Sequence, residues 1–271
     1  MSAITTTTNS VNENGNLLEL KTVQSGAFRT LIEALKEILT EANLEFDSTG
    51  LKIIAVDESH TILVYLRLHA DRFEHYHCPV KQVLGVNMMY LFKLIKTLEN
   101  TETLTFYLPA KNPNKLGIMM ENAEKQTTKN YFLKLFDTNV EDIQIPNLTF
   151  TSIIHMPSAD LQKICRDMSS LGEKVEITSN SSDLIFKCLG DFADQETIIR
   201  ENRLMRVQSS ASNEIIQGIF QLKHLFLFTK CTNLCPSIEI YLKNDAPLIL
   251  RYTVANLGEV KLVLAPLKNR A

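Results

Sequence analysis

The sequence predicts an α+β fold made of two similar domains, each with two helices packed on antiparallel sheets. Three observations support this prediction. The chain has 271 residues, a length between one large domain and two small ones. Short segments in which apolar and polar residues alternate recur along the chain, as expected for strands. A helix-and-strand pattern of the first half returns about 133 residues later, which indicates a duplicated domain.

The composition is that of a folded protein with nearly balanced charge. Hydrophobic residues make up 45% of the chain, which is enough for a sizeable core and excludes extensive disorder. The 28 Lys and Arg residues against 31 Asp and Glu residues give a net charge of -3, which excludes a histone-like basic protein. Nucleic-acid binding stays possible, because cations can gather on one face of an acidic protein.

An intracellular location is expected from the sequence. No apolar run reaches the roughly 18–20 residues that a membrane helix needs, and residues 1–16 lack the basic and apolar regions of a secretory signal. The five cysteines are scattered, and an odd number without a regular framework predicts reduced, buried thiols.

The first half of the chain predicts a tail followed by a complete domain. Residues 1–16 are rich in Thr, Asn and Ser and are expected to form a mobile tail. Apolar residues recur with a helical period in residues 25–42, and residues 87–99 predict a second helix that is followed by a strand at 103–108. Residues 51–68 predict two strands joined by a polar turn.

The second half repeats this order. Residues 158–172 and 220–232 again have a helical period, and a predicted strand follows at 237–242. Residues 136–150 are acidic, contain apolar residues and a proline, and are typical of an inter-domain connector. The predicted boundaries are a tail at 1–16, a first domain at 17–135, the connector at 136–150, a second domain at 151–268 and a tail at 269–271.

Each predicted helix carries two cations at helical spacing beside its apolar stripe. The pairs are Arg29 and Lys36, Lys93 and Lys96, Lys163 and Arg166, and Lys223 and Lys230. One such pair is usually an ordinary solvated face, but four pairs in a duplicated chain favour a shared basic surface. Such a surface suits the phosphate backbone of a duplex and reads no sequence. Base-reading residue clusters are missing from these segments, so direct base readout is not indicated.

An enzymatic function finds little support in the sequence. His75 and His77 alternate along a predicted strand with Cys78 on its other face, so the three are poorly placed to bind one metal ion. Ser59 and His60 are adjacent in a turn and cannot form a catalytic triad. The sequence contains neither a P-loop nor a GxGxxG motif. We therefore predict a protein without catalytic residues, cofactor or metal.

Several long blocks stand out in the sequence: LIEALKEILTEANLEFDSTGLKIIAVDESHTILVYLRL, YHC-x6-GVN, DIQIP, MPSADLQKICRDMSSLGEKVEI, FTKCT and LAPLK. Through these blocks the chain resembles the proliferating cell nuclear antigen family of DNA sliding clamps over about residues 20–268. The resemblance implies the DNA clamp fold, in which three chains close head to tail into a ring. It also implies that helices line the bore and that the eight cations named above face double-stranded DNA.

The resemblance implies two further surfaces. A pocket for partner proteins with a glutamine-aromatic motif, DNA polymerase among them, would be formed by Val56, His60, Leu63, Ile143, Ile145, Pro247, Ala265 and Pro266. The subunits would join through the strands at 130–136 and 196–202, with Tyr131, Phe132, Leu133, Thr197, Ile198 and Ile199 in the interface. A clamp loader would open the ring, and the implied location is the nucleus or a cytoplasmic site of viral replication.

The chain departs from the family pattern at Thr30, Thr61, Ser170 and Ser181, which indicates a divergent member such as a viral one. Thr61 lies in the implied pocket, where an aliphatic residue is usual. A second function, as one subunit of a hetero-trimeric checkpoint clamp, would use the same fold. The intact DIQIP and LAPLK segments favour a replication clamp.

Overall fold

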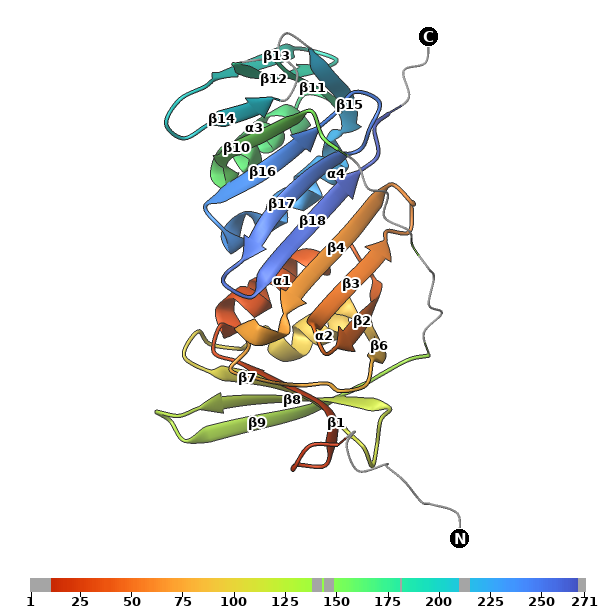
Figure 1. Cartoon of the computed structure of the whole chain (residues 1–271). Helices are drawn as coiled ribbons and strands as arrows, with labels where there is room; N and C mark the ends of the chain where they lie inside the picture. Colours follow the sequence, from red (N-terminus) through yellow and green to blue (C-terminus); the bar gives the residue numbers. More distant parts are fainter. Residues whose placement is uncertain (1–10, 138–142, 144–148, 181, 210–214, 268–271) are drawn as a thin grey trace. The chain divides into compact units, whose positions relative to one another are not determined.

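A computed structural model describes residues 11–137, 143, 149–180, 182–209 and 215–267 (Figure 1). The chain divides into two compact units. Unit 1 contains residues 1–55, 66–142 and 254–258, and unit 2 contains residues 56–65, 143–253 and 259–271. The domain boundaries expected from the sequence stay a prediction. Over the described ranges, no helix is long and apolar enough to cross a membrane.

Unit 1 contains two helices and two groups of strands. The helices are α1 (Ser25–Leu35) and α2 (Met88–Ile95), with a short 3-10 turn, η1, at Ala70–Arg72. One sheet has the order β5-β1-β7-β8-β9, with β5 at His75–His77, β1 at Asn16–Thr22, β7 at Thr103–Pro109, β8 at Lys115–Asn122 and β9 at Thr127–Lys134. The other group has the order β4-β3-β2-β6, with β4 at Ile62–His69, β3 at Gly50–Val56, β2 at Glu41–Asp47 and β6 at Gln82–Asn87. The strand β9 therefore lies at the edge of its sheet. The end of β3 at Val56 and the first half of β4, up to Tyr65, are counted in unit 2.

Unit 2 has the same kinds of element. Its helices are α3 (Ser158–Ser169) and α4 (Leu222–Phe228), and α4 continues into the 3-10 helix η2 (Thr229–Leu234). One sheet has the order β13-β12-β11-β15, with β13 at Asp194–Arg200, β12 at Asp183–Leu189, β11 at Lys174–Ser179 and β15 at Ile216–Gln221. The strands β14 (Arg206–Ser209), β10 (Ser152–Pro157), β16 (Ser237–Leu242), β17 (Leu248–Val254) and β18 (Gly258–Leu264) follow one another in a second group.

The periodicity of the sequence explains these elements. Side chains along β1 alternate between buried and half-buried, so that Leu18 and Leu20 enter the core. On α3, Leu161, Cys165 and Met168 are buried at helical spacing and pack towards the sheets of unit 2. The predicted α+β class, with two helices in each half of the chain, is confirmed.

The ends of several elements differ from the sequence prediction. The helix expected at 25–42 ends at Leu35, because Ala42, Leu44 and Phe46 are buried on β2, which pairs with β6. The fourth helix ends at Phe228, where the Thr229 hydroxyl donates to the Phe226 carbonyl at 2.7 Å. Local bonds of this kind compete with the regular helical pattern. Lys230 therefore lies on η2 and not on the α-helix.

Candidate functional site

Two of the eight predicted DNA-facing cations form contacts inside unit 1. The Arg29 guanidinium donates a hydrogen bond to the Leu98 carbonyl. The Lys36 ammonium forms an ion pair with Glu37, lies 4.8 Å from the centre of the Phe92 ring, and belongs to a side chain that is only 11% exposed. Both groups add to the local positive potential, but their side chains are less free than those of exposed lysines.

The other two cations of unit 1 lie on the exposed side of α2. Lys93 is exposed near the end of the helix, 5.5 Å from the centre of the Tyr90 ring, and Lys96 is exposed directly after the helix. The sequence of α2, Met88–Ile95, contains no acidic residue. Positive charge on α2 is therefore not offset by a carboxylate on the same helix, and it suits contact with a phosphate backbone.

In unit 2 all four predicted cations are exposed, but their surroundings differ. Lys163 and Arg166 share α3 with the exposed acids Asp160 and Asp167, so this helix has no net charge. Asp160 lies in the first turn, where the helix dipole favours an acid. The basic potential of this pair is correspondingly weaker.

The segment formed by α4 and η2 contains no acidic residue and exposes Lys223 and Lys230. Burial, together with the positive charge of Lys223, lowers the pKa of His224, so the imidazole is neutral at pH 7. The Lys230 ammonium lies 5.0 Å from the centre of the Phe226 ring. Helix α2 and the α4–η2 segment therefore carry the least compensated positive charge of the elements predicted to face DNA.

The residues of the predicted partner pocket belong to unit 2, and a hydrogen-bonded turn organises part of it. The turn joins β3 to β4, and its backbone at His60 has a positive φ of 53°. The Asp57 carboxylate accepts hydrogen bonds from the backbone N–H groups of Thr61 at 2.8 Å and Ile62 at 2.6 Å. Burial raises the pKa of Asp57, but its hydrogen bonds with Ser59, Ile62 and Thr61 outweigh this effect, and the pKa is lowered.

The C-terminal segment of unit 2 is attached to this turn. The backbone N–H of Ala265 donates to the Thr61 carbonyl at 3.1 Å, and that of Leu267 donates to the Ile219 carbonyl at 2.8 Å. His60 and Ala265 are exposed, and the other described pocket residues are half-buried: Val56, Leu63, Ile143, Pro247 and Pro266. Ile145 lies outside the described residues, as do Ser181 and most of the predicted connector. Half-buried apolar side chains beside an exposed loop form a surface of the kind that receives apolar peptide residues.

The two strands predicted to join subunits are both edge strands. The predicted segments 130–136 and 196–202 correspond to β9 and β13, which begin and end two or three residues earlier than expected. Phe132 on β9 is 53% exposed and Ile198 on β13 is 47% exposed. Tyr131, Thr197 and Ile199 are half-buried, and Leu133 faces the core of unit 1. An exposed edge presents unpaired backbone groups to a second chain.

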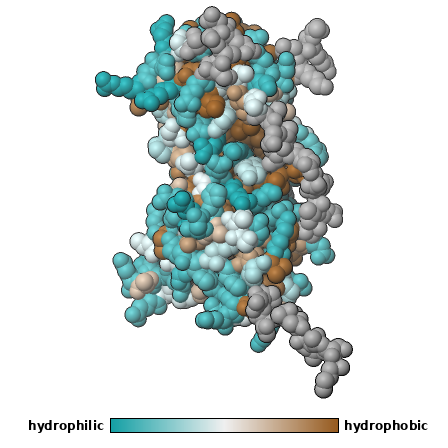
Figure 2. Space-filling view, viewed as in Figure 1, coloured by the Kyte–Doolittle hydropathy of each residue, from teal (hydrophilic) through white to brown (hydrophobic). Residues whose placement is uncertain are grey.

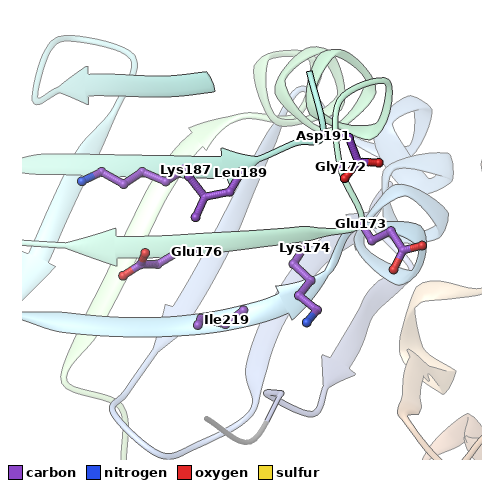
Figure 3. Close-up of a pocket in the computed structure, with 8 residues that line it drawn as sticks. All are labelled: Gly172, Glu173, Lys174, Glu176, Lys187, Leu189, Asp191 and Ile219. Carbon is purple, nitrogen blue, oxygen red and sulfur yellow. The ribbon is translucent and has the colours of Figure 1, made fainter. Parts of the chain in front are cut away.

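A further hollow of about 660 Å³ lies on the sheet β12-β11-β15 of unit 2 and was not expected from the sequence. Figure 3 shows Lys187 and Leu189 side by side on β12, with Glu176 on the neighbouring strand. Two lysines and three acids line the hollow, and Lys187 is paired with Glu196 at 2.9 Å. With one acid in excess, this hollow does not suit a phosphate group.

The thiols are enclosed in the protein. All five cysteines are free and buried. Burial raises the pKa of Cys165 and of Cys231 to about 12, so both are protonated at neutral pH. Neither therefore has the character of a catalytic nucleophile. Over the described part of the chain, no group of three His, Cys, Asp or Glu side chains could hold a metal ion.

Comparison with known proteins gives two consecutive matches that cover the chain almost completely. The model of the proliferating cell nuclear antigen N-terminal domain matches residues 17–143, and that of the C-terminal domain matches residues 144–267. The chain belongs to the proliferating cell nuclear antigen family. It is also similar to the "Probable DNA polymerase sliding clamp 1" of Paramecium bursaria Chlorella virus 1, with 32% identity over 261 residues, which are 95% of this chain and 99% of that protein.

Membership of the proliferating cell nuclear antigen family confirms the resemblance and the clamp fold expected from the sequence. The residue roles in the three surfaces stay predictions. Sequence reasoning missed the part of Asp57 in shaping the partner-pocket turn. The Asp57–Glu58–Ser59 sequence carries a signal for it, because Asp side chains commonly bond the backbone two residues further on.

Proposed function

We propose that this chain is a DNA sliding clamp, a ring that encircles duplex DNA and holds DNA polymerase and other replication and repair proteins on it. The observation that carries this function is the pair of consecutive family matches, one for each half of the chain. Nothing in the chain favours the alternative of a checkpoint-clamp subunit.

A ring stays on DNA because it surrounds the duplex, and this matters more than strong contacts between protein and DNA. A ring that surrounds DNA dissociates only when a subunit interface opens or when it reaches a free end. Exposed cations such as Lys93 and Lys230 then need only weak, sequence-independent contacts to phosphates, which permit sliding. A polymerase bound to the ring stays near the primer end, because the linkage raises its effective concentration there.

Ring closure would use the edge strands. The strand β9 of one copy would pair with β13 of the next, so that each copy offers two different edges and the pairing repeats head to tail. Three copies would close the ring. Pairing would satisfy the backbone groups of both edges and cover Phe132 and Ile198.

The remaining surfaces would recruit proteins. The turn with His60 and the segment with Ala265 and Pro266 would receive a partner peptide whose glutamine and aromatic residue enter the pocket. Loading onto closed DNA would require a separate clamp loader, since neither a P-loop nor an activated nucleophile is found along the sequence. The proposed clamp has no catalytic role, and it would act in the nucleus or at a cytoplasmic site of viral replication.

A threading experiment tests, without a clamp loader, whether the ring encircles DNA. The purified chain is incubated with linear duplex DNA at low salt, and both DNA ends are then blocked with streptavidin. We expect the chain to stay on blocked DNA through a high-salt wash and to leave when a restriction enzyme cuts the DNA. Release by salt to the same extent from blocked and open DNA would contradict the ring, because phosphate contacts alone weaken steeply with salt.

A further inference from the structure

An exposed aromatic residue lies at the turn that precedes the edge strand β13. The turn joins β12 to β13, and the Phe192 side chain at this turn is 77% exposed. Leu189, at the end of β12, is 78% exposed. Figure 2 shows a largely hydrophilic surface broken by small hydrophobic patches. Two large apolar side chains so open to water, within four residues of each other, mark a contact surface.

The turn that carries Phe192 is compact. A Cβ atom at Gly190 would overlap the carbonyl oxygens of Leu171 and Ala193, so only glycine fits there. The backbone N–H of Gly190 donates to the Asp194 carboxylate at 3.3 Å. Asp191 directly precedes Phe192 in the sequence, and Figure 3 shows it beside Gly172. The chain therefore presents an aromatic side chain between two acids on a short, well-defined turn.

A pocket with an apolar lining and two lysines lies in unit 1, beside the edge strand β9. It has a volume of about 690 Å³ and lies between α2 and the C-terminal end of β9. Its apolar lining includes Tyr90, Leu94 and Phe136. Two cations, Lys93 and Lys134, and one acid, Glu41, also line it, so the charged lining is positive by one. Tyr90 is 58% exposed. An aromatic side chain with acidic neighbours complements this pocket, because the ring suits the apolar lining and the acids suit the two lysines.

Strand direction brings these two features together in neighbouring copies. Within one copy, β9 pairs antiparallel with β8, and β13 pairs antiparallel with β12. If β13 of a second copy adds to β9 in the same sense, its N-terminal end at Asp194 lies beside the C-terminal end of β9 at Lys134. Parallel addition would place Arg200 there instead and bring two cations together.

We propose that Phe192 of one copy inserts into the pocket lined by Tyr90, Leu94 and Phe136 of a second copy of this chain, and that it anchors the strand pairing. The proposal rests on the proposed ring and names the residue that specifies its subunit contact. Asp191 and Asp194 meet the positive rim of the pocket at Lys134. Buried aromatic anchors at the centre of an interface contribute much of its binding energy, whereas strand pairing alone gives less selectivity.

The first test compares Phe192→Asp with Ile215→Asp by light scattering over a dilution series. Ile215 is also strongly exposed, at 61%, but it lies beside β15, at the opposite edge of the same sheet. We expect Phe192→Asp to raise the concentration at which the assembly half-dissociates by at least about tenfold, and Ile215→Asp to leave it unchanged. Since both residues are exposed, the far-UV circular dichroism spectra of the two variants at 25 °C should match that of the wild type, which shows that each variant folds.

The outcomes separate this inference from the ring itself. A wild-type chain that is monomeric at every concentration would overturn both. A wild-type assembly that Phe192→Asp leaves equally stable would overturn only the role of Phe192.

A cross-link gives a second, direct test. Phe192→Cys combined with Tyr90→Cys should form a disulfide between copies and give covalent multimers on a non-reducing gel. Ile215→Cys combined with Tyr90→Cys should stay monomeric on the same gel. An assembled ring in which the first pair does not cross-link under mild oxidation would refute the docking of Phe192 into this pocket.

Discussion

The carboxylate of Asp57 accepts a hydrogen bond from the backbone N–H of Ile62 at 2.6 Å, and this bond closes the turn between β3 and β4. The same carboxylate bonds the N–H of Thr61, whose carbonyl accepts from Ala265. One acidic side chain therefore links the turn at His60 to the segment that carries Ala265 and Pro266. The shape of the predicted partner pocket depends on a residue that lies beside it.

We expect Asp57→Ala to lower both stability and partner binding. The change leaves the N–H groups of Thr61 and Ile62 without their acceptor, at a cost of about 1–3 kcal/mol in the free energy of unfolding. Urea unfolding measures this loss, and Glu124→Ala, at an exposed turn of unit 1, serves as the control. Affinity for a glutamine-aromatic peptide should fall as well, and equal affinity in the variant and the wild type would show that the turn does not shape the pocket.

The free energy of unfolding should fall with acid because of carboxylates paired with Arg251. The guanidinium donates to Glu239 at 2.8 Å and to Glu259 at 2.5 Å. Burial raises the pKa of both acids. Hydrogen bonds from Tyr241 and Arg251 to Glu239, and hydrogen bonds and charge from Lys261 and Arg251 at Glu259, outweigh it and lower each pKa below the ordinary value of 4.5. Stability from these pairs is present above that value and is lost as pH falls through the lowered pKa.

Replacement of Arg251 by leucine should flatten this acid dependence. The variant should be less stable than the wild type at pH 7, and the difference should shrink as pH falls below 4.5. Unfolding by urea at several pH values measures the difference. If the difference in the free energy of unfolding stays constant down to strongly acidic pH, these ion pairs contribute nothing to the pH dependence.

Reversal of two charges on the least compensated basic elements should weaken DNA binding. The double variant Lys93→Glu with Lys230→Glu should bind duplex DNA less tightly at low salt and show a smaller slope of affinity against salt, by about 0.9 for each phosphate that the variant no longer neutralises. Fluorescence anisotropy measures both quantities. Lys111→Glu with Lys174→Glu, two exposed lysines outside the helices, is the matched control. Unchanged DNA affinity in the first variant would reject the DNA-facing assignment.

Loss of two connector side chains should abolish peptide binding and spare the assembly. Ile143 and Ile145 are predicted to line the partner pocket, and Ile143 is half-buried. The double alanine variant should lose binding of a glutamine-aromatic peptide in calorimetry and keep the wild-type mass in light scattering. Val23→Ala with Val80→Ala, two exposed valines of unit 1, should retain both properties. Full peptide affinity in the isoleucine variant would contradict the pocket assignment.

Truncation of Tyr131 should shift the assembly towards monomer. This side chain is half-buried on β9, the predicted subunit edge, so its removal takes apolar area from the proposed interface. Sedimentation velocity of Tyr131→Ala against the wild type measures the shift. An assembly that persists at low nanomolar concentration in the variant would reject this edge.

The helices and edge strands could be predicted because their signals are local, whereas side-chain environments could not. The period of apolar residues in α3 is visible in its own sequence, and so is the alternation along β1. The early end of α1 depends on β6, a strand far along the chain that pairs with β2. The burial of Lys36 depends on Phe92, more than fifty residues away. Spacing along the predicted helices could not show that Lys36, Lys96 and Lys230 lie beyond the ends of the α-helices, or that Lys36 would be covered.

Burial of all five thiols should protect the folded protein from oxidants. Oxidants and alkylating agents attack thiolates that they can reach, and in this chain the thiols are kept in the core, where burial raises the pKa of Cys165 and Cys231. The folded protein should therefore resist inactivation by peroxide. A single cysteine placed on its surface would be modified alone, while the native thiols react only after unfolding.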